Sequence, residues 1–354
     1  MTSVGILGGS NLGYAYAADL ARRGTPTTLW VRSPAHHAGV LKSGRLELTG
    51  VNGDHAVEVE ATTDLDTVLR HDLLIVGVPS WGYPALAEIL TGRLEPRHDV
   101  VLTPGNAGSV QLSAAAGEAV VGETAHPLFG ARRSGEVRVD VVARAVELPT
   151  GALPASRAPE VAGRLNEAVG EPIFVPTATV LDAALNNPNP IFHTVPCLLN
   201  VGYLEGVATF HLYRDGMSKG VHEALYAADE ERILLRETLG YGPPHYPQWT
   251  ILEPDPGRGE RVLFEVETFR TASRSPEYHG PHDLDHRFID EDTANLVLWV
   301  ELARLAGVAT PVMDGVVALV GAAAGRNYLA EGRTLRRVGL PDDSLNAVLA
   351  AVAG

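Results

Sequence analysis

The feature that most constrains this chain is a glycine-rich turn near its N-terminus, between an apolar run and a helix-forming run. Residues 4–7 suit a strand buried on both faces, and residues 14–21 are rich in helix formers. Gly8 and Gly13 occupy the first and third positions of a dinucleotide-binding fingerprint, where they permit a tight turn and close helix–strand packing. Strand, glycine turn and helix in this order predict that a pyrophosphate binds at the helix N-terminus.

The second fingerprint position, where backbone usually approaches phosphate, is occupied by Ser10. Serine is small, and its hydroxyl could itself donate a hydrogen bond to phosphate. The alternative interpretation is a plain strand-to-helix turn without a ligand. The predicted cofactor contacts in this turn are Gly8, Gly9, Ser10, Asn11, Leu12 and Gly13.

The second strand is predicted over residues 27–31, and the residues that follow it indicate the type of cofactor. NAD-binding folds usually place an acid here to bind the ribose 2′-hydroxyl, but this chain has Arg32 and Ser33. A guanidinium and a hydroxyl suit a 2′-phosphate. We therefore expect NADP(H) to be preferred, with NAD(H) as an alternative. Arg32 could instead be an ordinary surface arginine at a strand end.

Further apolar runs at residues 72–78 and 99–103 predict strands of the same sheet, with a helix over residues 85–90 between them. Ligands of such sheets bind beyond the carboxyl ends of the strands. We therefore expect the loops that contain Val78, Pro79, Ser80 and Asn106 to line the cofactor, although ordinary turn chemistry would also explain them.

The remaining pattern divides the chain into two parts. Residues 136–148 alternate like a strand, residues 160–168 look helical, and residues 172–176 suit a last short strand. Helical periodicity then prevails. The predicted fold is α/β, with a Rossmann-type doubly wound parallel sheet over residues 1–180 and an all-helical domain over residues 181–354.

Composition narrows the function classes. A chain of 354 residues fits two domains, and a formal net charge of −15 argues against general nucleic-acid binding. Cys197 is the sole cysteine, and neither a signal peptide nor a membrane-spanning stretch is recognisable. We therefore expect a cytoplasmic protein with no membrane partner, and the predicted sites require no metal.

In the second half, His193 follows a breaker cluster at residues 186–190 and sits among apolar neighbours. It could act as a general acid/base, or it could be an ordinary core histidine. The charges of residues 225–239 are most simply a solvated helix face. Asp290, Glu291 and Asp292 precede a predicted helix at residues 295–303. These acids could cap that helix, or a carboxylate paired with Arg287 could orient a histidine.

Together these segments resemble the octopine/nopaline (opine) dehydrogenase family over nearly the whole chain. The matching pieces, beyond the glycine turn, are Pro104-Gly105-Asn106, Glu123-Thr124 with Pro127 and Arg132, Asn187-Pro188 leading to His193 and Asn200, Gly280-Pro281, His286-Arg287 with Glu291-Asp292, and Gly332-Arg333-Thr334-Leu335 before Gly339-Leu340. Thr194 and Thr293-Ala294 depart from the family pattern beside the matched residues, which points to an unusual substrate.

The resemblance implies that the chain joins an amino acid or other amine to an α-keto acid and reduces the resulting imine with NAD(P)H. It makes His193, Arg287 and Asp292 the catalytic residues, with Arg132, Asn200 and Arg287 as candidates for substrate binding. Closure of two domains would then exclude water from the imine. Many enzymes of this plan are homodimers, although no stretch of this chain is a clear interface signal.

Two other functions stay open. Glycerol-3-phosphate and ketopantoate reductases resemble the first half, and they reduce a ketone or 2-keto acid with the help of a lysine in the helical half. The only lysine there is Lys219, which looks loop-borne. A non-catalytic NADP(H)-binding sensor is the third possibility.

Overall fold

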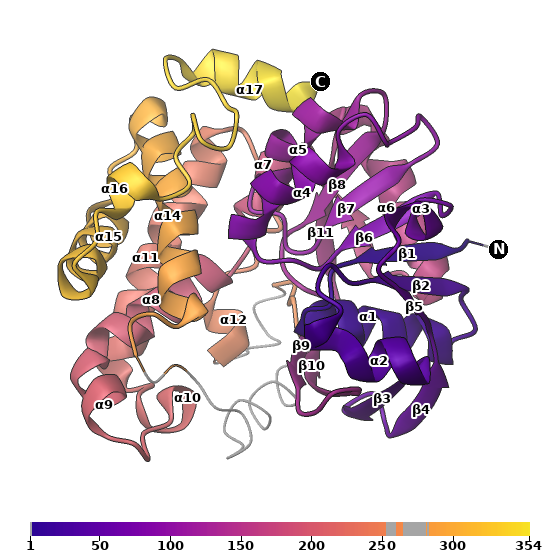
Figure 1. Cartoon of the computed structure of the whole chain (residues 1–354). Helices are drawn as coiled ribbons and strands as arrows, with labels where there is room; N and C mark the ends of the chain where they lie inside the picture. Colours follow the sequence, from indigo (N-terminus) through magenta and orange to yellow (C-terminus); the bar gives the residue numbers. More distant parts are fainter. Residues whose placement is uncertain (1, 253–259, 265–280, 282) are drawn as a thin grey trace. The chain divides into compact units, whose positions relative to one another are not determined.

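A computed structural model of the chain describes residues 2–252, 260–264, 281 and 283–354. The chain divides into two compact units, and each is described by itself. The sheet unit comprises Met1–Ala184 with Val352–Gly354, and the helical unit comprises Leu185–Ala351. Figure 1 shows the two units in different parts of the colour range. Gly280 of the predicted Gly280-Pro281 motif lies outside the described residues.

The sheet unit is built around an eight-stranded sheet with the order β12-β11-β8-β7-β6-β1-β2-β5. Its strands are β1 (Val4–Leu7), β2 (Thr27–Trp30), β5 (Glu60–Thr62), β6 (Leu73–Val76), β7 (Asp99–Leu102), β8 (Val120–Thr124), β11 (Leu148–Leu153) and β12 (Phe174–Pro176). The strands β1, β2, β5, β6, β7 and β8 run parallel. The strand order reverses at β1, and such a switch point is where doubly wound sheets bind ligands.

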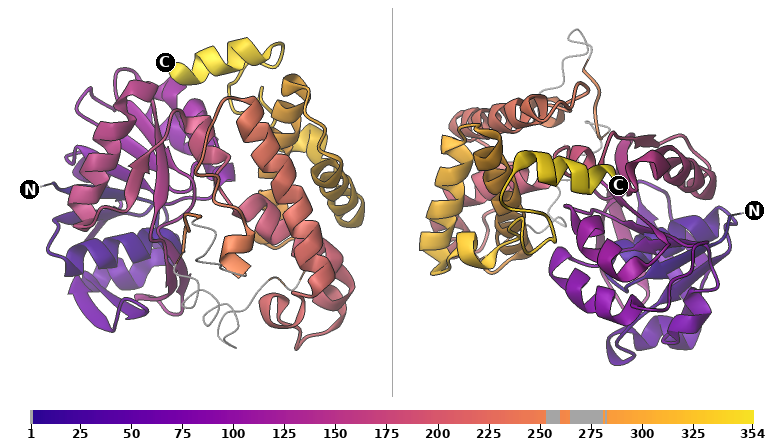
Figure 2. Two further views of the ribbon diagram at one scale, coloured as in Figure 1. Left: turned by 180° about the vertical axis from the view of Figure 1, so that it is seen from behind. Right: turned by 90° about the horizontal axis from the view of Figure 1, so that it is seen from above.

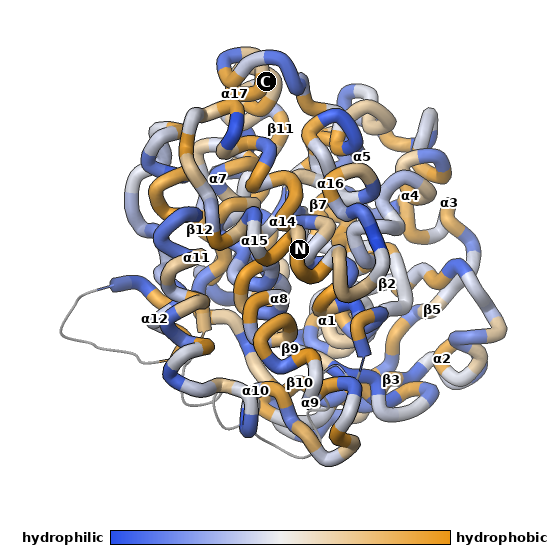
Figure 3. The backbone as a smooth tube through the Cα atoms, turned by 90° about the vertical axis from the view of Figure 1, so that its left-hand side faces the viewer, coloured by the Kyte–Doolittle hydropathy of each residue, from blue (hydrophilic) through white to orange (hydrophobic). Residues whose placement is uncertain are grey.

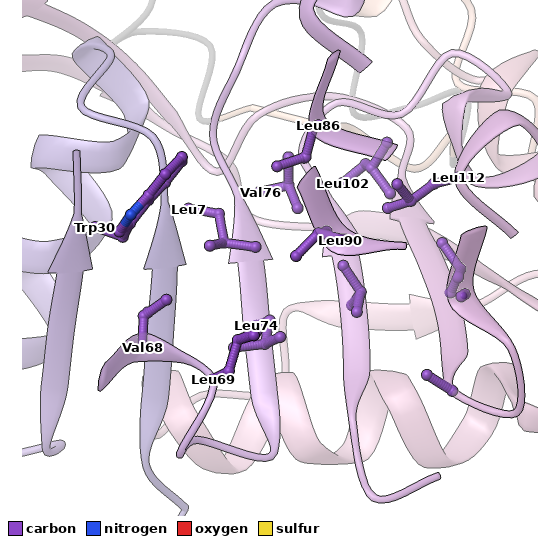
Figure 4. Close-up of a cluster of buried hydrophobic side chains, with 14 of the residues drawn as sticks. Leu7, Trp30, Val68, Leu69, Leu74, Val76, Leu86, Leu90, Leu102 and Leu112 are labelled. Atoms are coloured by element: carbon purple, nitrogen blue, oxygen red, sulfur yellow. The ribbon is translucent and has the colours of Figure 1, made fainter. Parts of the chain in front are cut away.

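Helices cover both faces of this sheet (Figures 1 and 2). They are α1 (Asn11–Arg22), α2 (Ala38–Ser43), α3 (Leu65–Val68), α4 (Tyr83–Leu90), α5 (Gly108–Ala116), α6 (Ala158–Val169) and α7 (Val180–Ala184). Figure 4 shows the apolar layer that α3, α4 and α5 form with the strands, in which Val76 lies beside Leu86 and Leu102 beside Leu112. Burial of such side chains is the main stabilising contribution to a sheet of this kind.

A second sheet of four strands, in the order β4-β3-β10-β9, was not predicted. Its strands are β3 (Arg45–Gly50), β4 (His55–Glu58), β9 (Phe129–Arg133) and β10 (Arg138–Arg144). The predicted strand at residues 136–148 is in fact β10 followed by the start of β11. Because the chain passes from β8 to β11 through this sheet rather than through a crossover helix, β11 returns antiparallel to β8. The main sheet is therefore not wholly parallel.

The helical unit contains α8 (Asn189–Leu199), α9 (Val201–Gly206), α10 (Leu212–Asp215), α11 (Lys219–Thr238), α12 (Trp249–Leu252), α14 (Arg287–Ala306), α15 (Pro311–Ala324), α16 (Tyr328–Glu331) and most of α17 (Leu345–Ala353). The helices α8 and α14 pack against each other, and much of α8 is orange, hence apolar, in Figure 3. A Rossmann-type sheet followed by a helical domain confirms the predicted fold class.

Only part of the charge on α11 forms the predicted solvated face: Glu230 and Glu237 are exposed, but other charged side chains are buried. Asp229 and Arg232 are 3% and 2% exposed and form an ion pair of 2.7 Å. Arg232 also donates to the main-chain oxygens of Leu185 and His245, and Asp229 accepts from the main-chain N–H of Gln248. The pair is buried because it satisfies the polar backbone of neighbouring segments, which amphipathic periodicity does not reveal.

Among the described helices, none combines the length and hydropathy that a membrane span requires.

Candidate active site

The helical unit brings His193 and Asp292 together from segments 99 residues apart in sequence. His193 Nδ1 lies 2.6 Å from Asp292 Oδ2, and both residues are almost fully buried. An ionised carboxylate can only accept a hydrogen bond, so this contact places a proton on Nδ1. The nitrogen through which His193 can exchange a proton with a substrate is then Nε2, as in a histidine oriented by an aspartate. Of the two interpretations of His193, the pair favours the general acid/base over the ordinary core histidine.

An aromatic ring fixes the plane of the imidazole. The ring of His193 stacks on Phe288 with 3.9 Å between centroids and 13° between planes. The guanidinium of Arg287 lies 5.0 Å from the centroid of the same phenyl ring. Phe288 therefore contacts both predicted catalytic groups, and the stack restricts the rotation of His193 about its side-chain bonds.

The acids around residue 290 do not precede a helix, because α14 begins earlier than predicted, at Arg287. His286 is the residue that caps it, with Nδ1 accepting from the Phe288 N–H at 3.2 Å. Asp290 binds Arg326 and accepts from the Tyr328 hydroxyl. Helix periodicity then turns Asp292 to the face that also carries Phe288, one turn earlier.

Arg287 does not form the predicted ion pair with a carboxylate. Its side chain is exposed, and no described carboxylate lies within ion-pair distance of it. Asp292 is bound by His193 instead, and Asp290 by Arg326. The guanidinium thus keeps its capacity for a negatively charged group that is not part of the described chain.

The two other predicted substrate residues lie in different surroundings. Asn200 ends α8 and donates through Nδ2 to the main-chain oxygens of Pro196 and Gly216, at 2.9 and 3.1 Å. Its amide group therefore has a structural role, and substrate binding by Asn200 stays a prediction. Arg132 lies in the sheet unit on β9, where it faces Asp140 across the strand pair. It is not part of the His193–Asp292 pair.

Cys197 lies one helical turn beyond His193 on α8 and is fully buried. Burial raises the pKa of its thiol well above the ordinary value, and the carboxylate of Asp292 adds to this effect. A neutral thiol is a poor nucleophile, so Cys197 serves as a small buried side chain.

In the sheet unit, the glycine turn has the geometry that a dinucleotide requires. Gly8 has a φ of +115° and packs against Val78. A Cβ on Gly13 would lie 1.8 Å from the main-chain oxygen of Gly8, so only glycine permits the observed packing of α1 on the turn. These residues therefore fit a bound dinucleotide cofactor.

Ser10 contributes differently from what was predicted. Its Oγ caps α1 by accepting from the Gly13 N–H, and its hydroxyl hydrogen goes to the main-chain oxygen of Gly77. The hydroxyl is thus not available to donate to phosphate. Asn11 accepts the main-chain N–H of Arg133 through its Oδ1, which ties the turn to β9.

The loops after β6 and β7 follow the neighbouring parallel strands, as expected for Val78, Pro79, Ser80 and Asn106. Asn106 and Ala107 adopt left-handed backbone conformations, with φ of 52° and 60°. The fully buried carboxylate of Glu123 holds this loop by accepting the N–H groups of Ala107 and Ser109 at 2.9 and 3.0 Å. Glu123 is one of the residues that carry the family resemblance, but the sequence alone did not indicate that it holds this loop.

The described residues contain no group of three or more histidine, cysteine, aspartate or glutamate side chains placed to hold a metal ion.

Comparison with protein families now gives two matches. Residues 176–324 match the family described as NAD/NADP octopine/nopaline dehydrogenase, alpha-helical domain, and residues 4–145 match the ketopantoate reductase family. An opine dehydrogenase from Arthrobacter sp. (strain 1C) is 27% identical over 361 residues, which cover 98% of this chain and 98% of that protein. The chain is similar to opine dehydrogenases over nearly its whole length, and its helical half matches the model of that family. This finding confirms the predicted resemblance.

Solved structures of opine dehydrogenases share the fold of this chain. An octopine dehydrogenase in complex with NADH and agmatine aligns with a TM-score of 0.74 and 16% identity, covering 99% of this chain and 98% of that one. A yersinopine dehydrogenase with bound NADP+ aligns with a TM-score of 0.64 and 15% identity, covering 99% and 95%. The first of these neighbours was solved with NADH and the second with NADP+.

Proposed function

We propose that the chain is an NADPH-preferring reductase of the imine that forms between an amine and an α-keto acid. The observation that carries this proposal is the buried hydrogen bond between His193 and Asp292. This hydrogen bond supports a role for His193 in which Nε2 exchanges protons with the substrate while Nδ1 stays bonded to Asp292. An octopine dehydrogenase has been solved with NADH and agmatine, which supports an amine substrate here.

His193 would handle the protons of imine formation. It would first take a proton from the substrate ammonium, so that the free amine can attack the keto carbon. It would then return that proton to the hydroxyl of the carbinolamine, which leaves as water. The product of this step is an iminium, whose carbon accepts a hydride to give a secondary amine. The nicotinamide, when bound, supplies that hydride.

Asp292 and Arg287 would support this chemistry in different ways. Asp292 would hold the imidazole in one orientation and stabilise its positive charge after it takes the proton. Arg287, which has no described carboxylate partner, would bind a carboxylate of the substrate. Arg132 and Asn200 are kept as weaker candidates for substrate contacts.

The preference for NADPH is proposed from the end of β2. Arg32 is exposed there and forms no ion pair with a described carboxylate, and Ser33 follows it. A free guanidinium beside a hydroxyl suits a 2′-phosphate. The remaining predicted contacts, from Gly8 to Gly13 and in the loops at Val78–Ser80 and Asn106, would hold the rest of the cofactor. A cytoplasmic location and a homodimer stay predictions.

A second candidate is a reductase of a 2-keto acid alone, which the ketopantoate reductase match over residues 4–145 favours. Such enzymes depend on a lysine, and Lys219 is the only lysine of the helical half. The structure places Lys219 at the exposed start of α11 rather than in a loop.

One experiment tests both candidates. Oxidation of NADPH and NADH is followed with pyruvate, glyoxylate or 2-oxoglutarate, each alone and then with pooled amino acids. We expect oxidation only when keto acid and amine are both present, its loss in His193→Asn, and its retention in Lys219→Met. Oxidation with keto acid alone, lost in Lys219→Met, would establish the second candidate. Tight cofactor binding without turnover on any pair would indicate a sensor.

A further inference from the structure

His37 and Arg133 contact Gly9 of the glycine turn, and Arg32 and Ser33 lie soon after the carboxyl end of neighbouring β2. We call these four residues the Gly9 cluster. The register pairs Leu7 with Trp30, and the Gly8 N–H donates to the Trp30 oxygen at 3.0 Å. The chain that leaves β1 therefore runs beside the chain that leaves β2. In dinucleotide-binding sheets, the ribose of the adenosine binds at this place.

Arg133 reaches the glycine turn from the second sheet. Its guanidinium carbon lies 4.2 Å from the centroid of the Tyr14 ring, and its Nη1 donates to the main-chain oxygen of Gly9 at 3.2 Å. Its main-chain N–H donates to Asn11 Oδ1 at 3.1 Å. Side chain and backbone are thus both anchored to the turn, which holds the guanidinium in one place.

The cluster carries positive charge without a matching acid. Neither Arg32 nor Arg133 forms an ion pair with a carboxylate in the described part of the chain, whereas many other arginines do. Glu136 follows Arg133 by three residues, and its carboxylate packs against Gly39. In a chain with a net charge of −15, two guanidinium groups without an acid favour an anionic ligand.

His37 supplies a hydrogen-bond donor at the same place. Its Nδ1 lies 3.0 Å from the Tyr14 hydroxyl and 3.4 Å from Arg133 Nη1. A guanidinium can only donate, so Nδ1 is the accepting nitrogen and Nε2 carries the proton of the neutral ring. A Cβ on Gly9 would lie 2.4 Å from Cε1 and 2.7 Å from Nε2, so the edge of the imidazole that includes Nε2 faces the glycine. Burial and the charge of Arg133 lower the pKa of His37, which agrees with a neutral ring.

We propose that Arg133 and His37 complete, with Arg32 and Ser33, a pocket for the ribose 2′-phosphate of NADP(H), and that Arg133 determines the choice of cofactor. This inference rests on the proposed use of NADPH. A phosphate offers three terminal oxygens, and the cluster offers two guanidinium groups, an imidazole N–H and a hydroxyl. The residue that selects the cofactor would thus belong to β9 and not only to the fingerprint after β2.

The test measures binding of two fragments to the full chain by calorimetry. One is 2′,5′-ADP, which carries the 2′-phosphate, and the other is 5′-AMP, which lacks it. We expect Arg133→Gln to weaken 2′,5′-ADP about tenfold, the effect of losing a charge-assisted hydrogen bond, and to change 5′-AMP less than twofold. Arg138→Gln is the matched control, because Arg138 lies on neighbouring β10 and pairs with Asp140. It should change neither affinity.

Equal loss of both fragments in Arg133→Gln would overturn the proposal, since it would show that Arg133 merely supports the turn. No loss of either fragment would overturn it as well. Arg133→Lys keeps the charge but loses the paired N–H donors of the guanidinium, so its affinity for 2′,5′-ADP should lie between those of the wild type and Arg133→Gln. This variant replaces Arg133→Gln if the glutamine variant does not fold.

Because binding needs no turnover, the outcome is separate from that of the proposed reaction. If the protein reduced imines with NADH and bound 5′-AMP more tightly than 2′,5′-ADP, the proposed reaction would be supported and the proposed 2′-phosphate pocket would be contradicted.

Discussion

At the scale of single residues, the proposed chemistry depends on a carboxylate that the fold has removed from water. Asp292 is 6% exposed, and its described hydrogen-bond partner is His193. Removing one member of a buried charged pair leaves the other without compensation, so each should be sensitive to substitution. The aromatic contact of Phe288 adds an orienting effect that acts without charge.

Asp292→Asn should lower kcat for the proposed reaction by about two to four orders of magnitude, because the imidazole loses both its orientation and its counter-charge. The matched control is Asp290→Asn on the same helix, since Asp290 binds Arg326 rather than His193. Steady-state kinetics over a pH series would check this. Similar rates in both variants would remove Asp292 from the proposed mechanism.

His126 should make stability dependent on pH. It is fully buried, and burial lowers its pKa to about 4. The unfolded chain binds a proton near pH 6.5 and the folded chain does not, so this contribution is complete above pH 6.5 and is lost as the pH falls toward 4. Between pH 7 and pH 5, the free energy of unfolding should fall by about 2 kcal/mol more in the wild type than in His126→Gln. Urea titrations at both pH values measure this; parallel losses would contradict it.

At the scale of elements, the turn between β1 and α1 places the strictest limit on side-chain size. Gly13 must lack a side chain because the Gly8 oxygen occupies that space, whereas Gly163 on α6 has nothing within 4 Å of the position of a Cβ. The two glycines lie in helices of similar length and differ in their surroundings.

Gly13→Ala should therefore destabilise the protein by about 1–3 kcal/mol and weaken NADPH binding, because α1 must move away from the turn. Gly163→Ala should stabilise it by about 0.5–1 kcal/mol, because alanine loses less backbone entropy in a helix. Denaturant unfolding and cofactor titration of the pair measure both effects. An unaffected Gly13→Ala variant would contradict the role given to the turn.

Elements with strong local signals could be predicted from the sequence. The glycine turn, the apolar strands β2, β6 and β7 and the helices α4 and α6 all follow from periodicity and composition. The second sheet could not, because its strands come from residues 45–58 and 129–144 and form only when distant segments pair. The start of α14 was missed because a histidine, not an acid, is its N-cap.

The candidate site was predictable only in part, for a related reason. His193 and Asp292 were identified by resemblance, and their contact depends on the packing of α8 against α14. The hydroxyl of Ser10 was assigned to phosphate because its partner, Gly77, lies 67 residues away in sequence. The resemblance makes Arg132 a candidate for substrate binding, and no local pattern shows that the adjacent Arg133 reaches the glycine turn.

At the scale of the whole molecule, cofactor binding should act as a stabilising linkage. A ligand that binds only the folded state at a concentration of 100 times its Kd adds about 2.7 kcal/mol to the free energy of unfolding. Because the proposed pocket recognises the 2′-phosphate, NADPH should bind more tightly than NADH and should raise Tm more at equal concentration. Thermal scans measure it, and hydrogen exchange should place the added protection in residues 4–37 and 77–80. A greater shift with NADH would contradict the preference.

The buried pair of Asp229 and Arg232 has a consequence for how such a protein can diversify. Its contacts beyond α11 are to the main-chain oxygens of Leu185 and His245 and the main-chain N–H of Gln248, which every amino acid except proline provides. Substitutions of side chains at positions 245 and 248 would therefore leave these bonds in place. The support that α11 gives to α8, the helix that carries His193, thus survives changes of side chain in the segment after α11.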